Sequence, residues 1–581
     1  MPDDGLSEFL PANPFMAGEQ LTFAGVMTRV SSDTALSATR RRDLLSSIRC
    51  LLRLMEIEPT ATPASPVAIR ERLKRLHPTQ AGISAKCLAN MKADVAFTLR
   101  HLGLTGSTLR NSKGLRPTWQ ALWESIEDDQ TRWKLSRLFR YCSALNVEPE
   151  KVDDPTIENL LTALVEESFV KDPEETIRAT IYAWNRARME VSEWPRQRLS
   201  RRPSRREGWT FPLETFPASF QKDVALWIHR LRGEDPLAED AVPKPLRPAT
   251  IKHRTFQVRM FASALVRRNV PAERITGLGV LVEVENFKEA LRYVLDRKGG
   301  SPTEAIYGLA TAMKAIARHH VKVPREHLEK LTRICARIKV RNRGLTEKNR
   351  RRLRQFDDPV NVSELLRLPA LLESLAKRTR GRKAAVLMQM ATAIELLIMT
   401  PVRIGNLAGL RLGESLFWTR PGRRGRLLLS IPPEDVKNGE PLEFELPKES
   451  AALIERYLDD YRPALFENPG EWFFPGRGGR AKRPGTLGPQ VKRIIYKHTG
   501  LEVNAHLMRH TGAKMYLDRY PHAYEVVRRV LGHKSMDTTT RFYTGFETRA
   551  AARHFDEVIL GLRKNAVPRK VRVTNKKRRG R

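Results

Sequence analysis

Residues 505–543 read AHLMRHTGAKMYLDRYPHAYEVVRRVLGHKSMDTTTRFY, and they hold most of the chain's candidate reactive side chains. His506 and Arg509 are three residues apart, His533 follows a Leu-Gly pair, and Tyr543 ends the stretch. Residues three apart share one face of an α-helix, so the H-x-x-R pair presents an imidazole and a guanidinium together. An arginine fork fits two phosphate oxygens and stays charged at any working pH. The stretch therefore predicts a mainly helical site that holds a phosphate beside a tyrosine.

Tyr543 is the candidate nucleophile of this site. A phenol with a pKa near 10 attacks poorly until its proton is removed and the phosphate charge is offset. Two more cations lie upstream: Arg403 directly follows a long apolar segment, and Lys437 precedes an Asn-Gly pair that favours a tight hairpin turn. Each well-aimed donor in such a site is commonly worth about 3–4 kcal/mol. We therefore expect side chains to neutralise the phosphate, with no metal and no cofactor.

Each of these residues has a plainer interpretation when it is taken alone. Arg403 then reads as a structural ion-pair residue, Lys437 as a solvated lysine at a hairpin tip, and Tyr543 as a core aromatic. His506 and His510 are four residues apart, which is compatible with a zinc pair, but no glutamate follows His506 and no third ligand is suitably spaced. It is the joint order of the residues that favours the reactive site.

The composition indicates a nucleic-acid partner. Lys and Arg number 103 against 66 Asp and Glu, a net charge of +37, and the pI is near 10.4. Such a surplus is usually neutralised by a polyanion. A ribosomal or heparin-binding basic protein is the plainer alternative, but an apolar content of 41% predicts real hydrophobic cores. The four cysteines are scattered without a C-x-x-C pair, which is typical of a reducing cytoplasm.

No membrane segment is expected. The N-terminus is acidic and lacks a signal-peptide pattern. The most apolar run, residues 384–402, contains Gln389 and Glu395 and is broken by Pro401, so it predicts a buried helix rather than a membrane span. We expect a cytoplasmic, nucleoid-associated protein.

The pattern along the chain divides it into five segments. Residues 1–40 lack periodicity and are expected to be loose, and residues 41–205 are expected to form a helical extension of unassigned role, with DNA binding as one candidate. Residues 213–345 form another helical block, residues 346–565 carry the site, and residues 566–581 are a basic tail. Within 346–565, the segments 427–431 and 442–446 predict a small antiparallel sheet in a mainly α fold, and the second of them alternates apolar and polar residues as a half-buried strand does.

Two further features lie in the first half of the chain. The basic run 196–207 (RQRLSRRPSRRE) favours a solvated linker over a sequence-reading element. Residues 133–152 are weakly similar to residues 250–275, since each is a basic helix with Arg, Phe and Leu that is followed by Asn and a Pro-containing turn. This similarity raises the hypothesis of a duplicated DNA-binding helical unit.

The order Arg403, Lys437, H-x-x-R, L-G-H and Tyr543 resembles the tyrosine recombinase (phage-type integrase) family over about residues 215–563. The resemblance implies a multi-domain clamp on DNA, with a core-binding domain at 213–345 and a catalytic domain at 346–565. It also implies the role of each site residue: phosphate binding by Arg403 and Arg509, general-acid action by Lys437, the two histidine positions at His506 and His533, and a 3′-phosphotyrosyl link at Tyr543. The spacing differs in one place: Tyr543 is ten residues after His533, where many relatives have nine, and Phe542 holds the ninth position.

The resemblance implies a site-specific recombinase or integrase that cleaves and rejoins double-stranded DNA, in the service of a mobile genetic element. The expected assembly is a homo-multimer, a tetramer on DNA, alone or with other recombinase subunits. Two alternatives stay open on the residues: a type IB topoisomerase-like enzyme that relaxes DNA, and a catalytically silent DNA-binding regulator. The complete set of six site residues argues against the regulator.

Overall fold

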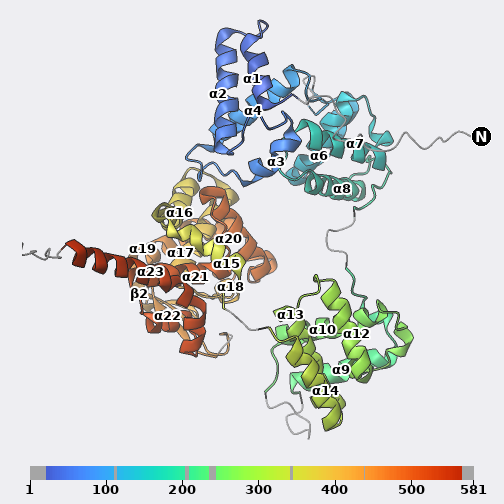
Figure 1. Cartoon of the computed structure of the whole chain (residues 1–581), viewed down its shortest axis with the longest axis vertical. Helices are drawn as coiled ribbons and strands as arrows, with labels where there is room; N and C mark the ends of the chain where they lie inside the picture. Colours follow the sequence, from blue (N-terminus) through green and yellow to red (C-terminus); the bar gives the residue numbers. More distant parts are fainter. Residues whose placement is uncertain are drawn as a thin grey trace, which may run out of the picture. The chain divides into compact units, whose positions relative to one another are not determined.

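The computed structural model describes residues 21–106, 108–109, 114–202, 208–234, 244–340, 344–436 and 439–564. The chain divides into two compact units, one formed by Met1–Arg202 with Gly344–Arg581 and the other by Pro203–Arg343 (Figure 1). Lys437 and the expected basic tail at 566–581 lie outside the described residues. The expectation of a mainly α fold with a small antiparallel sheet is confirmed.

The first unit begins with two groups of helices, each with its own hydrophobic core. The first group comprises α1 (Phe23–Ser32), α2 (Ala38–Leu54), α3 (Pro66–Arg75) and α4 (Ala85–His101). The second group comprises α5 (Pro117–Glu124), α6 (Asp129–Ala144), α7 (Asp154–Glu167) and α8 (Pro173–Glu190).

The expectation of a loose segment over residues 1–40 is wrong from Phe23 onward. Phe23, Val26 and Val30 occupy one face of α1 and are almost completely buried. Thr22 caps this helix, since its hydroxyl oxygen accepts a hydrogen bond from the Gly25 amide at 3.3 Å. Glycine, proline and serine in the preceding residues concealed this short apolar stripe.

The described part of the basic run at 196–207 is packed rather than fully solvated. Leu199 is completely buried, and its backbone exchanges two hydrogen bonds with the Asn185 side chain, at 2.8 and 3.0 Å. Trp184 donates from its indole nitrogen to the Gln197 carbonyl at 2.9 Å. The linker interpretation is therefore wrong for residues 197–199, which pack along α8 through the Leu199 side chain and three backbone groups.

The second unit is a helical bundle around one core that includes Phe220, Phe261 and Phe287. Its α-helices are α9 (Ala218–Arg232), α10 (Pro248–Val266), α11 (Leu278–Val282), α12 (Val284–Asp296), α13 (Glu304–Ile316) and α14 (Arg325–Arg337). Helix α10 packs against both α9 and α12.

The apolar run at 384–402 forms α17, which is largely buried as predicted and lies among the remaining helices of the first unit (Figure 1). In chain order they are α15 (Glu347–Arg354), α16 (Pro359–Lys377), α17 (Gly381–Met399), α18 (Ile404–Ala408), α19 (Lys448–Arg456), α20 (Pro484–Thr499), α21 (Ala505–Arg519), α22 (Tyr524–Leu531) and α23 (Met536–Lys564). Helix α17 contacts α16, α19, α20 and α21. No helix among the described residues is both long and apolar enough to cross a bilayer.

The sheet has the order β1-β2-β3 and is antiparallel throughout, with β1 at Leu416–Arg420, β2 at Arg424–Ile431 and β3 at Leu442–Glu445. The sequence did not predict β1. The ladder between β2 and β3 ends at the pair Ile431 and Leu442, and the turn expected at Asn438 lies outside the described residues. Pro432 and Pro433 follow β2 directly, and proline has no N–H to continue a ladder.

Candidate active site

Arg403 is held where the buried helix α17 gives way to the short helix α18. The Thr400 hydroxyl donates to the Leu396 carbonyl at 2.7 Å and closes the end of α17. Arg403 is the N-cap of α18 in an extended conformation. Burial lowers the pKa of its guanidinium, which nevertheless stays charged near neutral pH.

Arg509 fastens the loop that carries Arg403 to the loop that carries His533. It lies on α21, is 3% exposed, and donates to the carbonyls of Pro401 and, at 2.7 Å, Leu531. Burial, followed by the charge of Arg403, lowers its pKa to about 10. The charge of Arg403 thus acts on Arg509, so the two guanidinium groups lie close enough to interact electrostatically.

His533 follows a glycine that the local fold requires. Gly532 caps α22 with φ at +59°, and a Cβ there would lie 2.6 Å from the Leu442 side chain. The His533 ring lies with Nδ1 3.0 Å from the Thr539 hydroxyl at the start of α23. Burial, then Arg509 and Arg403, lowers the His533 pKa to about 4, so this ring is neutral near pH 7.

Tyr543 lies on α23 and is completely buried, with its hydroxyl 2.7 Å from Nδ1 of His510. Burial, then the neighbouring cationic side chains, lowers the His510 pKa to about 3, and burial raises the pKa of Tyr543. Both groups are therefore neutral near pH 7, and the phenol donates to Nδ1 in the tautomer of His510 that carries its proton on Nε2. The sequence had suggested His510 only as a zinc partner of His506.

The contact between His510 and Tyr543 had no sequence signal, because the two residues lie 33 positions apart on different helices. His506 is exposed on the same helix, and its ring centre lies 5.2 Å from that of His510. One turn further along α21, Lys514 is buried and ion-paired with Asp357 at 2.9 Å and Asp518 at 2.5 Å. These ion pairs fix α21 and therefore the residues on it.

Lys437 lies outside the described residues, so its position in the site stays a prediction. The segment just before it is anchored: Val436 is buried, and the Asn406 amide donates to the Asp435 carbonyl at 3.0 Å. Asn406 stands three residues after Arg403, so the arginine loop and the start of the lysine loop are tied together.

Comparison with known proteins identifies the domain that holds this site. Residues 368–549 match the phage integrase family, and this range contains all six predicted site residues. No curated protein matches the chain significantly.

Solved structures with similar folds include a XerA recombinase, which is 16% identical, with 57% of this chain and 98% of that chain covered and a TM-score of 0.23. A lambda integrase dimer bound to a core site is also 16% identical, with coverage of 54% and 95% and a TM-score of 0.33. The Tn1549 transposon integrase bound to transposon end DNA is 15% identical, with coverage of 54% and 97% and a TM-score of 0.32. Similarities this low carry no residue-level correspondence.

The family match spans the elements that carry Arg403, Arg509, His533 and Tyr543, and the electrostatic coupling of these residues agrees with their joint order in the sequence. Residues 368–549 therefore form a phage integrase domain, and the site described above lies within it.

Proposed function

We propose that the protein is a site-specific recombinase of a mobile genetic element, with Tyr543 as the nucleophile that cleaves double-stranded DNA. The main support is the buried hydrogen bond between the Tyr543 hydroxyl and His510, next to the coupled arginines of the site. A core aromatic needs no titratable partner and no surrounding group of cations, so this environment favours a reactive phenol.

In the proposed cleavage step, the Tyr543 oxygen attacks the scissile phosphorus and the bond from phosphorus to the 5′ oxygen breaks. The phenolic proton passes to His510, and Lys437 supplies a proton to the leaving 5′ oxygen. Arg403 and Arg509 neutralise the non-bridging oxygens. Rejoining is the reverse reaction, with a 5′ hydroxyl attacking the 3′-phosphotyrosyl bond.

In this mechanism, the low pKa of His510 keeps the phenolic proton on Tyr543 until DNA binds. Burial and neighbouring cations disfavour the imidazolium. A bound phosphate brings negative charge, which offsets those cations and raises the affinity of His510 for a proton. Proton transfer from Tyr543 is thereby coupled to DNA binding.

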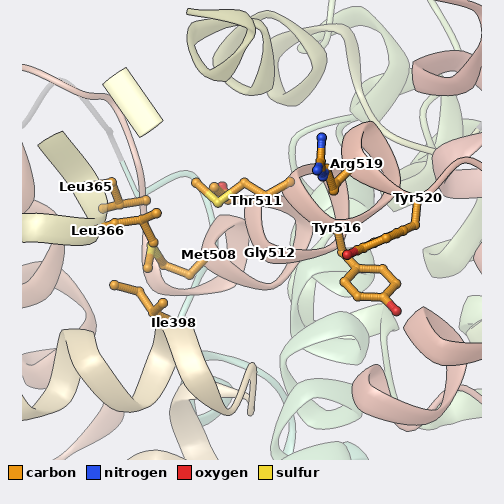
Figure 2. A pocket seen from close by; sticks show the side chains of 10 residues that line it. Leu365, Leu366, Ile398, Met508, Thr511, Gly512, Tyr516, Arg519 and Tyr520 are labelled. Carbon is orange, nitrogen blue, oxygen red and sulfur yellow. The ribbon is translucent and has the colours of Figure 1, made fainter. Parts of the chain in front are cut away.

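The proposed assembly is a homo-multimer on DNA, and we assign its contact to the second half of α23. Phe555, Val558, Ile559 and Leu562 are all substantially exposed there, at 38–63%. The same domain offers an apolar pocket between α16, α17 and α21, drawn in Figure 2 and lined by Leu365, Leu366, Ile398, Met508, Thr511, Gly512, Met515, Tyr516, Arg519 and Tyr520. We propose that α23 of a second copy fills this pocket.

Two deletions and one substitution test the assembly. Removing residues 548–581 is expected to preserve single-site DNA binding but to abolish pairing of two sites and recombination. Removing only 565–581 is expected mainly to weaken binding and to flatten its salt dependence. Leu366→Glu, at a pocket residue that is 47% exposed, should reproduce the long deletion. Recombinant product at the wild-type rate from the long deletion would contradict the contact.

A nicked suicide duplex tests the catalytic proposal itself. Wild type is expected to form a covalent adduct that survives a denaturing gel, whereas Tyr543→Phe should bind nearly as well and form none. An adduct that persists in the variant would place the nucleophile elsewhere. Exchange between two duplexes, as opposed to relaxation of one supercoiled circle, distinguishes the recombinase from a type IB topoisomerase-like enzyme.

A further inference from the structure

Two helical segments of the chain repeat one local structure at an offset of 123 residues. We call residues 129–152 the α6 module and residues 252–275 the α10 module. Asn146 and Asn269 both follow the end of a helix with positive φ, at 55° and 65°. Each is followed by a valine whose amide donates back to the helix, to Cys142 at 2.9 Å and to Leu265 at 3.1 Å.

Helix ends of this kind are common, but the repeat continues beyond them. A single 3-10 turn follows in each module, at Pro149–Lys151 and at Ala272–Arg274. Each turn ends on a completely buried β-branched residue, Val152 or Ile275. The hydrogen bonds of the two turns also correspond, with the Lys151 and Arg274 amides each donating at 3.0 Å to the residue three positions earlier.

The hydrophobic faces of the two helices keep the same register. The buried pairs, each separated by 123 positions, are Leu135 and Val258, Leu138 and Phe261, Phe139 and Ala262, and Cys142 and Leu265. The weak similarity between residues 133–152 and 250–275 in the sequence thus corresponds to a shared local structure. The matched cores also define which residues correspond on the exposed faces.

The exposed face of each module carries an aromatic residue at the same position. Trp133 is 65% exposed and corresponds to Phe256, which is 42% exposed. Arg259 lies over the Phe256 ring at 5.3 Å. In the α6 module, Lys134 lies 5.6 Å from the ring centre of Tyr182, which is 57% exposed. Cations beside exposed aromatics suit contact with a polyanion that has apolar sugar and base surfaces.

Two further arginines extend the basic surface of the α6 module. Arg137 and Arg140 are exposed on α6 and form no ion pair with any described residue. Arg137 is four positions, and Arg140 seven positions, after Trp133, so all three share one helix face. Trp133 and the two arginines thus form one exposed surface of α6.

We propose that the α6 module is a second surface for duplex DNA, separate from the catalytic domain, in which Arg137, Arg140 and Lys134 contact phosphates and Trp133 packs on the sugar-phosphate edge. The choice of duplex DNA rests on the proposed function, because that is the substrate the recombinase engages, and on the positive charge of the surface. The residues around Trp133 thus give the N-terminal extension a role in holding DNA beyond the cleavage site.

The test is the salt dependence of binding by the full chain to a long duplex that contains the cleavage site. Arg137→Ala/Arg140→Ala should reduce the slope of log Kobs against log salt by about 1.8, or about 0.9 for each phosphate contact. If the variant and the wild type bind equally at 1 M salt, this change in slope makes the variant bind about thirtyfold more weakly at 0.15 M. Trp133→Ala should weaken binding without changing the slope.

The matched control is Arg49→Ala/Lys86→Ala, which removes the same charge from exposed positions on α2 and α4. An unchanged slope in the Arg137/Arg140 variant, or a change equal to that of the control, would overturn the proposal. If the Arg137/Arg140 variant lost binding to single-stranded DNA but kept binding to the duplex, the proposal of a duplex surface would also be overturned.

Covalent adduct formation on a saturated suicide duplex separates this proposal from the catalytic one. All three variants should form adduct at the wild-type rate, because none of their residues lies in the active site. Adduct formation with an unchanged slope would refute only the second surface. A changed slope, with no adduct even in wild type, would support the surface and refute the catalytic proposal.

Discussion

Replacing His510 is the sharpest test of how Tyr543 is activated. The hydroxyl of Tyr543 is buried and lies 2.7 Å from Nδ1 of His510. His510→Leu removes the proton acceptor, whereas His510→Asn keeps a hydrogen-bond acceptor of similar reach that cannot take a proton. General-base catalysis commonly contributes about 10²- to 10⁴-fold. Both variants should therefore slow cleavage by about this factor, while DNA binding stays intact.

The pH dependence separates catalysis from packing. Because burial holds the His510 pKa at about 3, the wild-type ring is already neutral at pH 6 and can accept a proton as soon as phosphate is bound. In a variant that lacks the His510 imidazole, hydroxide must remove the phenolic proton. The cleavage rate of that variant should therefore rise steadily with pH between about 6 and 9. A loss caused only by packing would lower the rate equally at every pH.

The low pKa of His510 in the folded protein also makes folding stability fall as the pH is lowered. Unfolded His510 has an ordinary pKa of 6.5, so the unfolded chain binds more protons than the folded one between about pH 6.5 and 3. This contribution to stability is complete above about pH 6.5 and is lost as the pH falls through that window. His510→Asn should therefore make unfolding of the catalytic domain less sensitive to acid.

The assay is single-turnover cleavage of a suicide duplex at saturating protein. A second substrate carries sulfur in place of the bridging 5′ oxygen, since a thiolate leaves without needing a proton. Lys437→Ala should recover on this substrate if lysine is the general acid, whereas His510→Leu should not. Cleavage by His510→Leu at the wild-type rate and with the wild-type pH profile would refute the assigned role.

Arg403→Ala and Arg509→Ala should each slow saturated single-turnover cleavage by about 10²- to 10³-fold, whereas Arg578→Ala in the tail should change only binding; equal losses in all three would mean that the arginines act through affinity alone. Cleavage should proceed in EDTA, since side chains are expected to neutralise the phosphate, and strict dependence on magnesium would count against the mechanism. Gly532→Ala should lower stability by about 1–2 kcal/mol for its left-handed backbone, and more if Leu442 cannot move, measured as the unfolding midpoint of the catalytic domain.

The sequence was sufficient for features that depend on local patterns. The apolar run at 384–402 predicted the buried α17, and the short segments 427–431 and 442–446 predicted β2 and β3. The short strand β1 was missed because its five residues lie between turns and its pairing with β2 is a non-local contact. Helix α1 was missed for a different reason: its apolar stripe is short and follows residues rich in glycine, proline and serine.

The sequence by itself determined the candidate site residues, because their joint order along the chain is specific even though each residue alone is common. Only the tertiary structure decided which groups touch. In the folded chain, Arg509 donates to the carbonyls of Pro401 and Leu531, and His510 lies against Tyr543. The physical reason is that burial and hydrogen bonding depend on residues brought together from different helices. Those contacts set the protonation of the site, and no spacing within one segment encodes them.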